Sequence, residues 1–418
     1  MLLINADLHI HSRFSGATSE KMTLRVLAKE AAKKGVSLLG TGDCLHPIWL
    51  KEIKELLTKI DDGTFELDKT RFVLTAEVED SNRVHHLLIF PSLSAVEWFI
   101  ELIRTKAQNL ASDGRPNVYL TGEQLAEYAK KLDVIIGASH AFTPWTAIYA
   151  YHDSLKSCYG DLTDYVSFVE LGLSADTNYA DRIKELAYKT FLTNSDAHSP
   201  YPLRLAREFN RFQVEAVTFE ELKGSILRVR GRKPVLNVGI PPEEGKYNET
   251  ACIKCYQHYK RQEAIALNWY CNSCTGRIKK GVKDRIEELA DYKEPMHPEH
   301  RPPYLHLIPL SEIIAKALHL DSPLTKKVFE VWNELVKEFK TEVNVLVDVN
   351  IEELRKRTDE RVAHAIQIFR EGNIIIQPGG GGKYGVIKLP EELPLEDKEA
   401  AAPEHAVKEQ IQKKIFDF

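Results

Sequence analysis

The sequence predicts an α/β protein in which a barrel of strands and helices is followed by a small cysteine-bearing module and a mainly helical C-terminal region. Short apolar runs alternate with amphipathic stretches from residue 1 to about 235, and this alternation is typical of strands joined by crossover helices. Four of the six cysteines lie between residues 251 and 285, and the apolar spacing over 286–390 is mainly helical. A chain of 418 residues is long enough for two or three domains.

Seven apolar runs in the first 235 residues are expected to form strands. In chain order they are LLINADLHI (2–10), VSLLGTGD (36–43), RFVLTAEVE (71–79), HLLIF (86–90), VIIGASH (134–140), VSFVELGL (166–173) and KTFLTNSDAH (189–198). Helical spacing is found in TLRVLAKEAAKKG (23–35), AVEWFIELIRTKAQNLAS (95–112) and TGEQLAEYAKKL (121–132). Seven such units suit a barrel better than a short open sheet, and the strand ends of a βα barrel converge on one face, where chemistry takes place.

Composition and charge exclude several classes of protein. Hydrophobic residues make up 43% and charged residues 28% of the chain, which is typical of globular proteins. No apolar run reaches the roughly 18–20 residues that span a membrane, and the start MLLINADLHIHS lacks the pattern of a secretory signal. Six cysteines are too few for a disulfide scaffold, so we expect a cytoplasmic location.

Histidines and carboxylates gather at the ends of the predicted strands. They are His9, His11, Asp43, Glu77, His86 (with His85 as the alternative on the opposite strand face), His140, Asp196 and His198. Alternate residues of a strand point the same way, so each of the pairs His9/His11 and Asp196/His198 shares one face. Mixtures of imidazole and carboxylate suit zinc, manganese and iron. A cluster of such cations lowers the pKa of bound water and stabilises both oxygens of a phosphoryl transfer.

This arrangement resembles the polymerase-and-histidinol-phosphatase (PHP) family, which shares the HxH near the N-terminus, an aspartate after the second strand, a glutamate near residue 77 and a late SDAH. The resemblance implies a distorted (β/α)7 barrel over residues 1–235 that hydrolyses phosphoesters with two or three divalent metals, zinc, manganese or magnesium. The ligands that it implies are His9, His11, Glu77, His86, His140, Asp196 and His198. We expect Asp196 also to orient or deprotonate the attacking water.

Two positions depart from the PHP pattern. The family has TDH at the second strand, where this sequence reads TGDC, so Asp43, Cys44 or His46 would replace the expected histidine. A further ligand often follows the first histidine by about eight residues, where this chain has Ala17. The cluster would then hold two metals, or a third only weakly.

Four cysteines predict a structural zinc site. Cys252, Cys255, Cys271 and Cys274 have the spacing C-x2-C-x15-C-x2-C, which is typical of a zinc ribbon, here over 251–285. From Cys252 to Arg285 there are eight basic and only two acidic residues, although the whole chain has a net charge of −5. Aromatic residues are interleaved with them: Tyr256, Tyr259, Trp269 and Tyr270. Cations with stacking rings favour a nucleic-acid surface; the alternatives are a solvated basic face and a small aromatic core.

The remaining segments are assigned from composition. Residues 236–250 contain two prolines and two glycines and are expected to be a linker, and 286–390 is expected to be a helical domain. Residues 391–418 are acidic and poor in apolar residues, as in a disordered tail. Within them, Gln412, Ile415 and Phe418 resemble the peptide by which repair proteins bind the sliding clamp (PCNA). The alternative is a C-terminal helix packed on the body.

The order of a PHP-like barrel, a CxxC…CxxC ribbon and a helical end with a GGGGKYG element resembles the endonuclease Q family. This resemblance implies a DNA-repair endonuclease that cuts 5′ to a deaminated base (uracil, hypoxanthine or xanthine) or an abasic site. It also implies that the helical domain over 286–390 binds DNA. A base inside a duplex cannot reach a barrel mouth, so the lesion would be extruded. The rivals are a small-molecule phosphoesterase, which leaves the ribbon unexplained, and a non-catalytic nucleic-acid-binding module, which the departures at Cys44 and Ala17 keep open.

Overall fold

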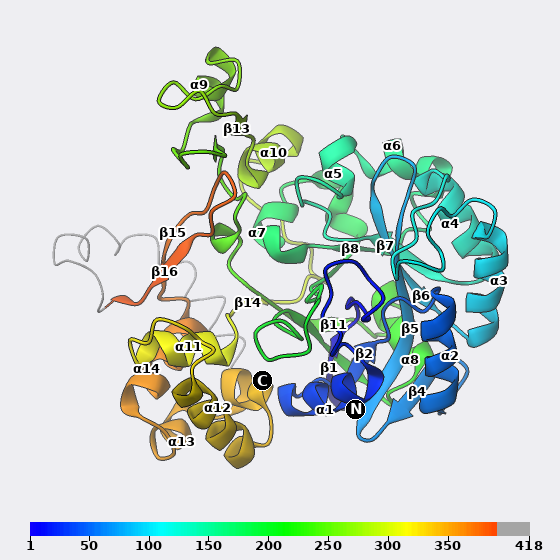
Figure 1. The fold of residues 1–418 in the computed structure, drawn as a ribbon, viewed down its shortest axis with the longest axis horizontal. Helices are drawn as coiled ribbons and strands as arrows, with labels where there is room; N and C mark the ends of the chain where they lie inside the picture. The colour runs from blue at the N-terminus through cyan, green and yellow to red at the C-terminus, as the bar shows by residue number, and fades with distance from the viewer. Residues whose placement is uncertain (391–418) are drawn as a thin grey trace. The chain divides into compact units, whose positions relative to one another are not determined.

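The structure is a computed structural model that describes residues 1–390 (Figure 1). The described chain divides into two compact units. Unit 1 comprises residues 1–172, 177–237 and 289–302, and unit 2 comprises 173–176, 238–288 and 303–390. The expected tail over 391–418, with the clamp-binding peptide Gln412, Ile415 and Phe418, lies outside the described residues.

Unit 1 is built on a curled sheet whose central strands follow the seven expected apolar runs (Figure 1). These strands are β1 (Leu2–Asp7), β2 (Leu38–Gly40), β5 (Thr70–Glu79), β6 (His85–Phe90), β7 (Ile135–Ala138), β8 (Phe168–Glu170) and β9 (Thr190–Leu192). They lie side by side in this order, and β10 (Phe209–Val214) and then β11 (Pro234–Gly239) extend the sheet beyond β1. The short strands β3 (Thr58–Lys59) and β4 (Thr64–Leu67) branch from β5. The predicted α/β class is confirmed.

The sheet is mixed rather than wholly parallel. Strands β1, β2 and β5 pair in parallel, as do β7, β8 and β9, whereas β6 is antiparallel to both of its neighbours. The connection from β5 to β6 spans only residues 80–84, which is too short for a crossover helix, so β6 must turn back along β5. A bridge between Ile10 and Ala197 joins the segments that follow β1 and β9. It brings the carboxyl ends of the first and last of these strands together.

Helices cover the sheet and are, in order, α1 (Leu24–Lys34), α2 (Pro47–Leu56), α3 (Leu93–Ile103), α4 (Gly122–Lys131), α5 (Ile148–Tyr151), α6 (Leu155–Tyr159), α7 (Thr177–Ala180) and α8 (Phe219–Leu227). The three predicted helices correspond to α1, α3 and α4, although α3 ends at Ile103, well before residue 112. Helix α4 begins with a capping box between Thr121 and Gln124. Inside the curl, buried side chains from successive strands form one core, as in Leu38, Val73 and Phe168.

Unit 1 is completed by residues from far along the chain. Arg301 donates hydrogen bonds to both carboxylate oxygens of Asp181, at 2.7–3.1 Å, and to the carbonyl of Lys189, and its guanidinium lies 3.3 Å from the ring centre of Phe191. Both members of this ion pair are almost fully buried. Residues 289–302 therefore return to the unit that the chain leaves at residue 237.

Unit 2 contains the cysteine-bearing ribbon and the helical region (Figure 1). Its elements are β12 (Ala251–Cys252), α9 (Arg261–Ala266), β13 (Ile278–Lys279), α10 (Val282–Leu289), β14 (Tyr304–His306), α11 (Leu310–Ala317), α12 (Lys326–Phe339), α13 (Ile351–Arg355), α14 (Glu360–Glu371), β15 (Ile375–Gln377) and β16 (Val386–Lys388). The expected linker over 236–250 is packed rather than free, because Asn248 and Thr250 are buried and Glu249 pairs with Gly380.

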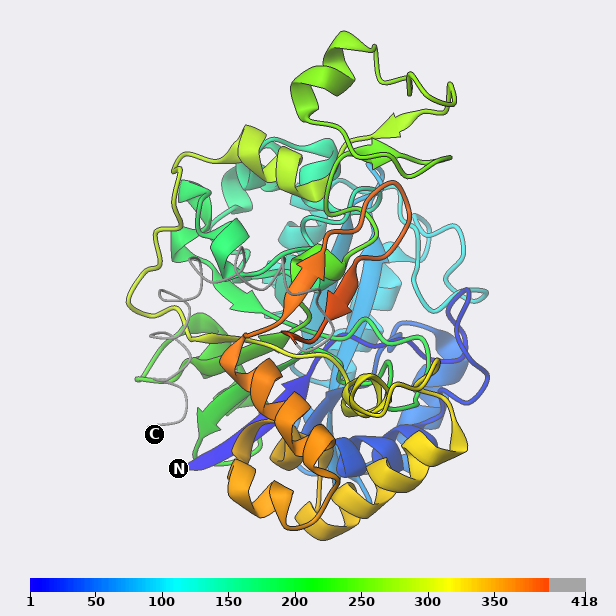
Figure 2. The same cartoon turned by 90° about the vertical axis from the view of Figure 1, so that its left-hand side faces the viewer.

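Strands β15 and β16 form a hairpin that carries the glycine run (Figure 2). Gly381 has φ +64°, and a Cβ there would lie 2.3 Å from the carbonyl oxygen of Cys252. Glycine thus allows the hairpin loop to contact the ribbon backbone directly. In residues 1–390 no helix combines the length and the apolar character needed to cross a lipid bilayer.

Candidate metal centre and four-cysteine cluster

Histidine and carboxylate side chains converge at one end of the curled sheet of unit 1. The members are His9 and His11 after β1, Glu77 in β5, His85 in β6, His140 after β7 and Asp196 after β9. They form two groups, His9/His11/Asp196 and Glu77/His85/His140. Within each group the potential ligand atoms lie within 4.8 Å of one another. The structure thus brings together most of the residues that the sequence pattern assigned to metal binding.

Glu77 joins the two groups. Its Oε1 lies 2.9 Å from both His85 Nδ1 and His140 Nε2. Its Oε2 lies 3.5 Å from His11 Nε2, in the other group. Its Oε1 is also 3.5 Å from His9 Nε2, and a carboxylate in reach of both groups is suited to bridge two cations a few ångströms apart.

Three donor atoms of the first group are buried without a satisfying partner. His9 Nε2, His11 Nε2 and Asp196 Oδ1 make no hydrogen bond of good geometry within residues 1–390. His11 Nε2 and Asp196 Oδ1 lie 3.1 Å apart, and His9 Nε2 lies 3.8 Å from the same oxygen. Burying polar atoms without partners is costly, and a divalent cation would satisfy all three. The donor set therefore fits a metal of the zinc or manganese class.

The assignment of His86 to this cluster was wrong, and His85 takes its place. In the antiparallel pair of β5 and β6, Glu79 lies opposite His85 and Val78 lies opposite His86. Opposite residues share a face, and Glu77 shares the face of Glu79 because alternate residues point the same way. His85 therefore points toward Glu77, and His86 points to the other side of the sheet.

Asp43 lies beside the cluster and contacts its member His11. Its Oδ1 is 3.2 Å from His11 Nδ1, while its Oδ2 accepts hydrogen bonds from the backbone and hydroxyl of Ser12. This arrangement orients the His11 ring so that Nε2 faces the other ligands. Asp43 was predicted as a ligand, and its geometry is that of a positioning residue.

Cys44 and His46, which were the alternatives to Asp43, lie apart from both ligand groups. Cys44 is buried, and its backbone N–H donates to Thr75. His46 caps α2 and stacks on Phe14, with ring centres 4.4 Å apart. His198 is closer: its ring centre is 4.5 Å from that of His11, and its Nδ1 lies 2.9 Å from the carbonyl oxygen of Asp196.

Two residues that contact the cluster were not identified from the sequence. Glu170 ends β8, and its Oε2 lies 2.8 Å from His9 Nδ1 and accepts the backbone N–H of His140. The signal for Glu170 was present, because it is a carboxylate at a strand end. Arg115 donates to Glu77 Oε2 at 3.2 Å from the loop between α3 and α4, and nothing in the local sequence marks it.

The site combines strong charge interactions with strained backbone conformations. Burial would lower the pKa of His11, but the neighbouring carboxylates of Asp196 and Asp43 raise it to about 10. Burial opposes ionisation of Asp196, yet His11 and His9 outweigh it and hold the pKa of this carboxyl below its ordinary range. Asp43, His140 and Asp196 all have positive φ, between 28° and 48°. Such strained conformations concentrate at functional sites.

The four cysteines form a compact cluster in unit 2. Their sulfur atoms all lie within 4.8 Å of one another, with 3.5 Å between Cys252 and Cys274 and between Cys255 and Cys271. The hydroxyl of Tyr259 donates to Cys271 Sγ, and this hydrogen bond lowers the pKa of the thiol to about 6. Close sulfur atoms with donors directed at them fit a tetrahedral zinc site.

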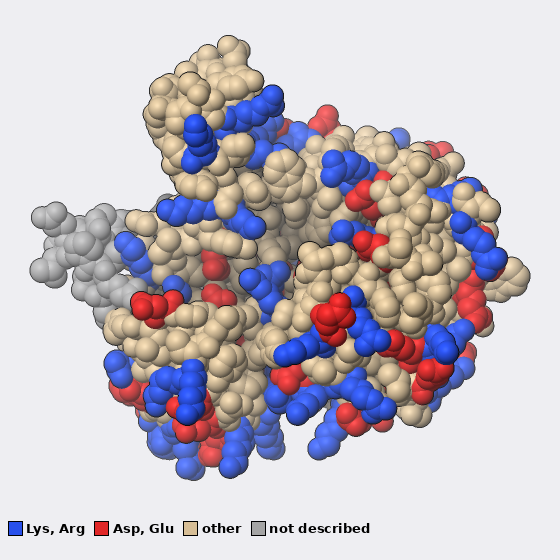
Figure 3. Space-filling view, viewed as in Figure 1, with Lys and Arg blue, Asp and Glu red and all other residues tan. Residues whose placement is uncertain are grey.

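The aromatic residues of the ribbon have two different roles. Tyr259 is buried in the small ribbon core and Trp269 packs against it. Tyr256 and Tyr270 are 44% and 50% exposed. Lys254 and Arg277 are also exposed, and the guanidinium of Arg277 lies 5.8 Å from the ring centre of Tyr270. Figure 3 shows Lys and Arg side chains on this ribbon. Exposed rings beside exposed cations suit contact with a nucleic-acid strand.

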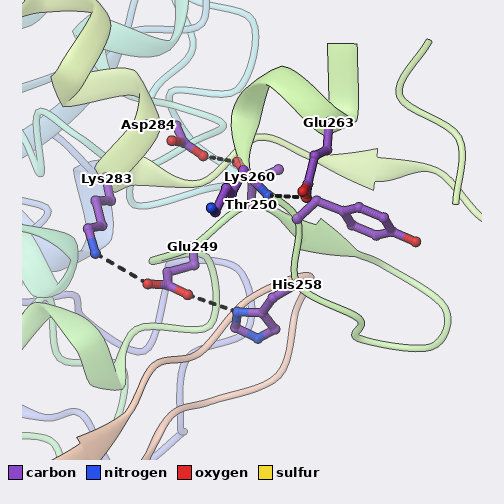
Figure 4. Close-up of a pocket in the computed structure, with 8 residues that line it drawn as sticks. Glu249, Thr250, His258, Lys260, Glu263, Lys283 and Asp284 are labelled. Carbon is purple, nitrogen blue, oxygen red and sulfur yellow. Dashed lines mark hydrogen bonds and ion pairs between the residues drawn. The ribbon is translucent and has the colours of Figure 1, made fainter. Parts of the chain in front are cut away.

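A cavity of about 420 Å³ lies beside the ribbon within unit 2 (Figure 4). Glu249 projects into it, 3.0 Å from His258 Nδ1 and 3.3 Å from Lys283 Nζ. These ion pairs connect Glu249, which precedes β12, to His258 and to the first turn of α10.

Comparisons with known proteins cover both units. Residues 309–373 match the MJ0043 C-terminal domain family. The chain is 46% identical over 261 residues to the uncharacterized protein MJ0043 of Methanocaldococcus jannaschii, covering 61% of this chain but only about a third (32%) of that protein. It is 32% identical over 409 residues to the uncharacterized protein YqxK of Bacillus subtilis, covering 93% of this chain and 100% of YqxK.

Two solved structures match nearly the whole chain. One is the lesion-specific endonuclease PfuEndoQ of Pyrococcus furiosus, with 50% identity, a TM-score of 0.90 and coverage of 96% of this chain and 99% of that one. The other is endonuclease Q in complex with a 27-mer duplex substrate with an abasic lesion at the active site, with 50% identity, a TM-score of 0.89 and coverage of 95% and 100%. The chain described here belongs to the endonuclease Q family.

Proposed function

We propose that this protein is a metal-dependent DNA endonuclease that hydrolyses the phosphodiester on the 5′ side of a damaged nucleotide. Its substrates would be duplexes with an abasic site or a deaminated base, namely uracil, hypoxanthine or xanthine. The observation that carries the proposal is 50% identity to a lesion-specific endonuclease over 96% of the chain. We also propose a cytoplasmic location, where cysteines that form no disulfide, like all six of this chain, persist.

The side chains around Glu77 would hold two or three divalent cations, which we propose to be zinc, manganese or magnesium. Bound there, the cations would lower the pKa of water and stabilise charge on the phosphate oxygens. Glu170 and Asp43 orient the ligand rings of His9 and His11. Arg115 is partly exposed beside Glu77, so its guanidinium is available to a phosphate. Asp196, whose Oδ1 lies 3.1 Å from His11 Nε2, would ligate a cation and orient the attacking water.

Unit 2 would bind the flanking DNA. The exposed ribbon cations would neutralise phosphates, and Tyr256 and Tyr270 offer faces on which bases can stack. A damaged nucleotide is easier to unstack than an intact base pair, so extrusion into the barrel would itself select lesions. We propose that the helical region over 286–390 takes part in this contact.

The function is tested with end-labelled duplexes that each carry one abasic site, uracil, hypoxanthine or xanthine, beside an undamaged duplex and a small phosphomonoester. We expect cleavage 5′ to the lesion and none of the undamaged duplex. Hydrolysis of the phosphomonoester alone would favour a small-molecule phosphoesterase. DNA binding without hydrolysis of either substrate, in protein loaded with metal, would favour a binding module.

Replacing Glu170 with glutamine is expected to lower the metal affinity of the barrel by about 10- to 100-fold, because the ring of His9 loses its charged partner. The measurement is a titration of cleavage against Mn²⁺ concentration. Glu185→Gln is the matched control, since Glu185 accepts hydrogen bonds from Tyr149 and Leu155 outside both ligand groups. An unchanged metal requirement in Glu170→Gln would contradict the orienting role.

We propose in addition that the C-terminal residues bind a sliding clamp of the PCNA type. One helical turn would place Ile415 and Phe418 side by side as an apolar plug, and Gln412 would hydrogen-bond in a separate pocket. Deletion of residues 411–418 is expected to abolish clamp binding in a calorimetric titration and to leave cleavage of free DNA unchanged. Lys414→Ala, between the contact positions, should bind normally. Clamp binding by the truncated protein would rule out this peptide.

A further inference from the structure

A third group of potential ligands lies on the opposite face of β6. One atom each of Asp80, His86 and Cys158 lies within 4.8 Å of the other two. The three residues are 1%, 0% and 5% exposed. They come from the turn after β5, from β6 and from α6, so segments far apart in the sequence meet here. None of them belongs to the cluster around Glu77 or to the four cysteines.

Asp80 and His86 are each held by hydrogen bonds on one side, and each directs one remaining polar atom toward the other residue. Asp80 Oδ1 accepts the backbone N–H groups of Asn82 and Val84, at 2.8 and 2.9 Å. Its Oδ2 is buried, makes no hydrogen bond of good geometry within the described chain, and lies 3.3 Å from His86 Nε2. His86 Nδ1 forms a 2.8 Å hydrogen bond with the hydroxyl of Tyr159, and its Nε2 is buried in the same way as Asp80 Oδ2. Such a bond on the second nitrogen is the usual arrangement of a metal-binding histidine.

Cys158 and His86 can both pack against the start of α4 only because residue 122 is a glycine. Gly122 is the first residue of α4, and a Cβ there would lie 2.6 Å from Cys158 Sγ and 3.1 Å from His86 Cε1. Any other residue would displace the thiol or the ring.

We propose that Asp80, His86 and Cys158 bind a zinc-class transition-metal ion, distinct from the barrel cluster and from the ribbon zinc. One oxygen, one nitrogen and one sulfur donor form a mixed set that suits Zn²⁺, and a fourth position remains for water or another side chain. The ion joins the 80–84 turn, β6 and α6 behind the strand that carries His85. Its role is structural, since the three ligands are buried and no substrate can reach them.

The test begins with crystals of the wild-type protein grown with zinc and measured on both sides of the zinc absorption edge. We expect an anomalous difference peak between Asp80, His86 and Cys158, with the ribbon peak as the internal reference for full occupancy. A fully occupied ribbon without a peak at this position would overturn the proposal and leave an ordinary buried Asp80–His86 ion pair. This measurement needs no variant and does not depend on cleavage.

Metal content in solution gives the second measurement. After gel filtration with a mild chelator, Cys158→Ala should contain one zinc fewer per chain than the wild-type protein. Cys44→Ala is the matched control, because Cys44 is an equally buried thiol of unit 1 outside every ligand group. A wild-type zinc count in folded Cys158→Ala would contradict the proposal.

Discussion

Asp196→Asn is expected to reduce cleavage of a lesion-bearing duplex at least about a hundredfold, while the affinity for that duplex stays unchanged. Asp196 Oδ1 lies 3.1 Å from His11 Nε2, at the centre of the first ligand group. An amide is a poor metal ligand and cannot accept a proton as a base, yet it has nearly the same size as the carboxylate. Single-turnover cleavage of an end-labelled abasic duplex measures the first effect, and fluorescence anisotropy measures the second.

The control for this experiment is Asp62→Asn. Asp62 is an exposed carboxylate of the same unit whose charge is paired with Lys59, so its replacement should leave both measurements at the wild-type level. A cleavage rate of Asp196→Asn within about tenfold of the wild-type rate would contradict both proposed roles of Asp196, as general base and as metal ligand.

Cys271→Ser is expected to release one zinc ion per chain, unfold the ribbon and weaken DNA binding. The buried residues of the ribbon core are Cys252, Tyr259, Ala264, Cys271 and Ile278, so two of the five are themselves ligands. So small a core cannot fold without its metal, whose binding contributes on the order of 10 kcal/mol in isolated zinc modules. Zinc content by mass spectrometry and hydrogen exchange along the chain measure the outcome.

Loss of protection should be confined to residues 251–285 and to the hairpin loop that contacts Cys252 through Gly381. Ser273→Ala is the matched control, because it alters an exposed side chain of the same loop and leaves all four thiols in place. An unchanged zinc content in Cys271→Ser would show that the four cysteines do not form the predicted site.

The sequence was sufficient for the parts of the site that depend on strand ends and on spacing. His9, His11, Glu77, His140 and Asp196 were found because each follows or ends an apolar run, and strand ends meet on one side of a curled sheet. The ribbon was found because its spacing alone defines a tetrahedral site. The α/β class followed from the alternation of strands and helices, although the short 80–84 connection, which makes β6 antiparallel, was not taken into account.

The residues that were missed depend on register and on long-range contacts. His85 and His86 are neighbours, and only the pairing of Glu79 with His85 decides which of them faces Glu77. Arg115 reaches Glu77 from a loop, across a sequence separation of 38 residues. Glu170 could have been identified, since it is a carboxylate within the predicted strand run 166–173, but a single carboxylate carries no pattern of its own.

The buried pair of Arg301 and Asp181 has a consequence for how the chain folds during synthesis. The two residues are 120 positions apart, so at 5–20 residues per second Asp181 is made roughly ten seconds before its partner. During that interval the nascent barrel holds a carboxylate without its cation, at a cost of about 3–5 kcal/mol if it is buried. The first unit therefore reaches its final stability only after the whole ribbon has left the ribosome. A fragment that stops at residue 235 lacks Arg301, so its first unit would never reach that final stability.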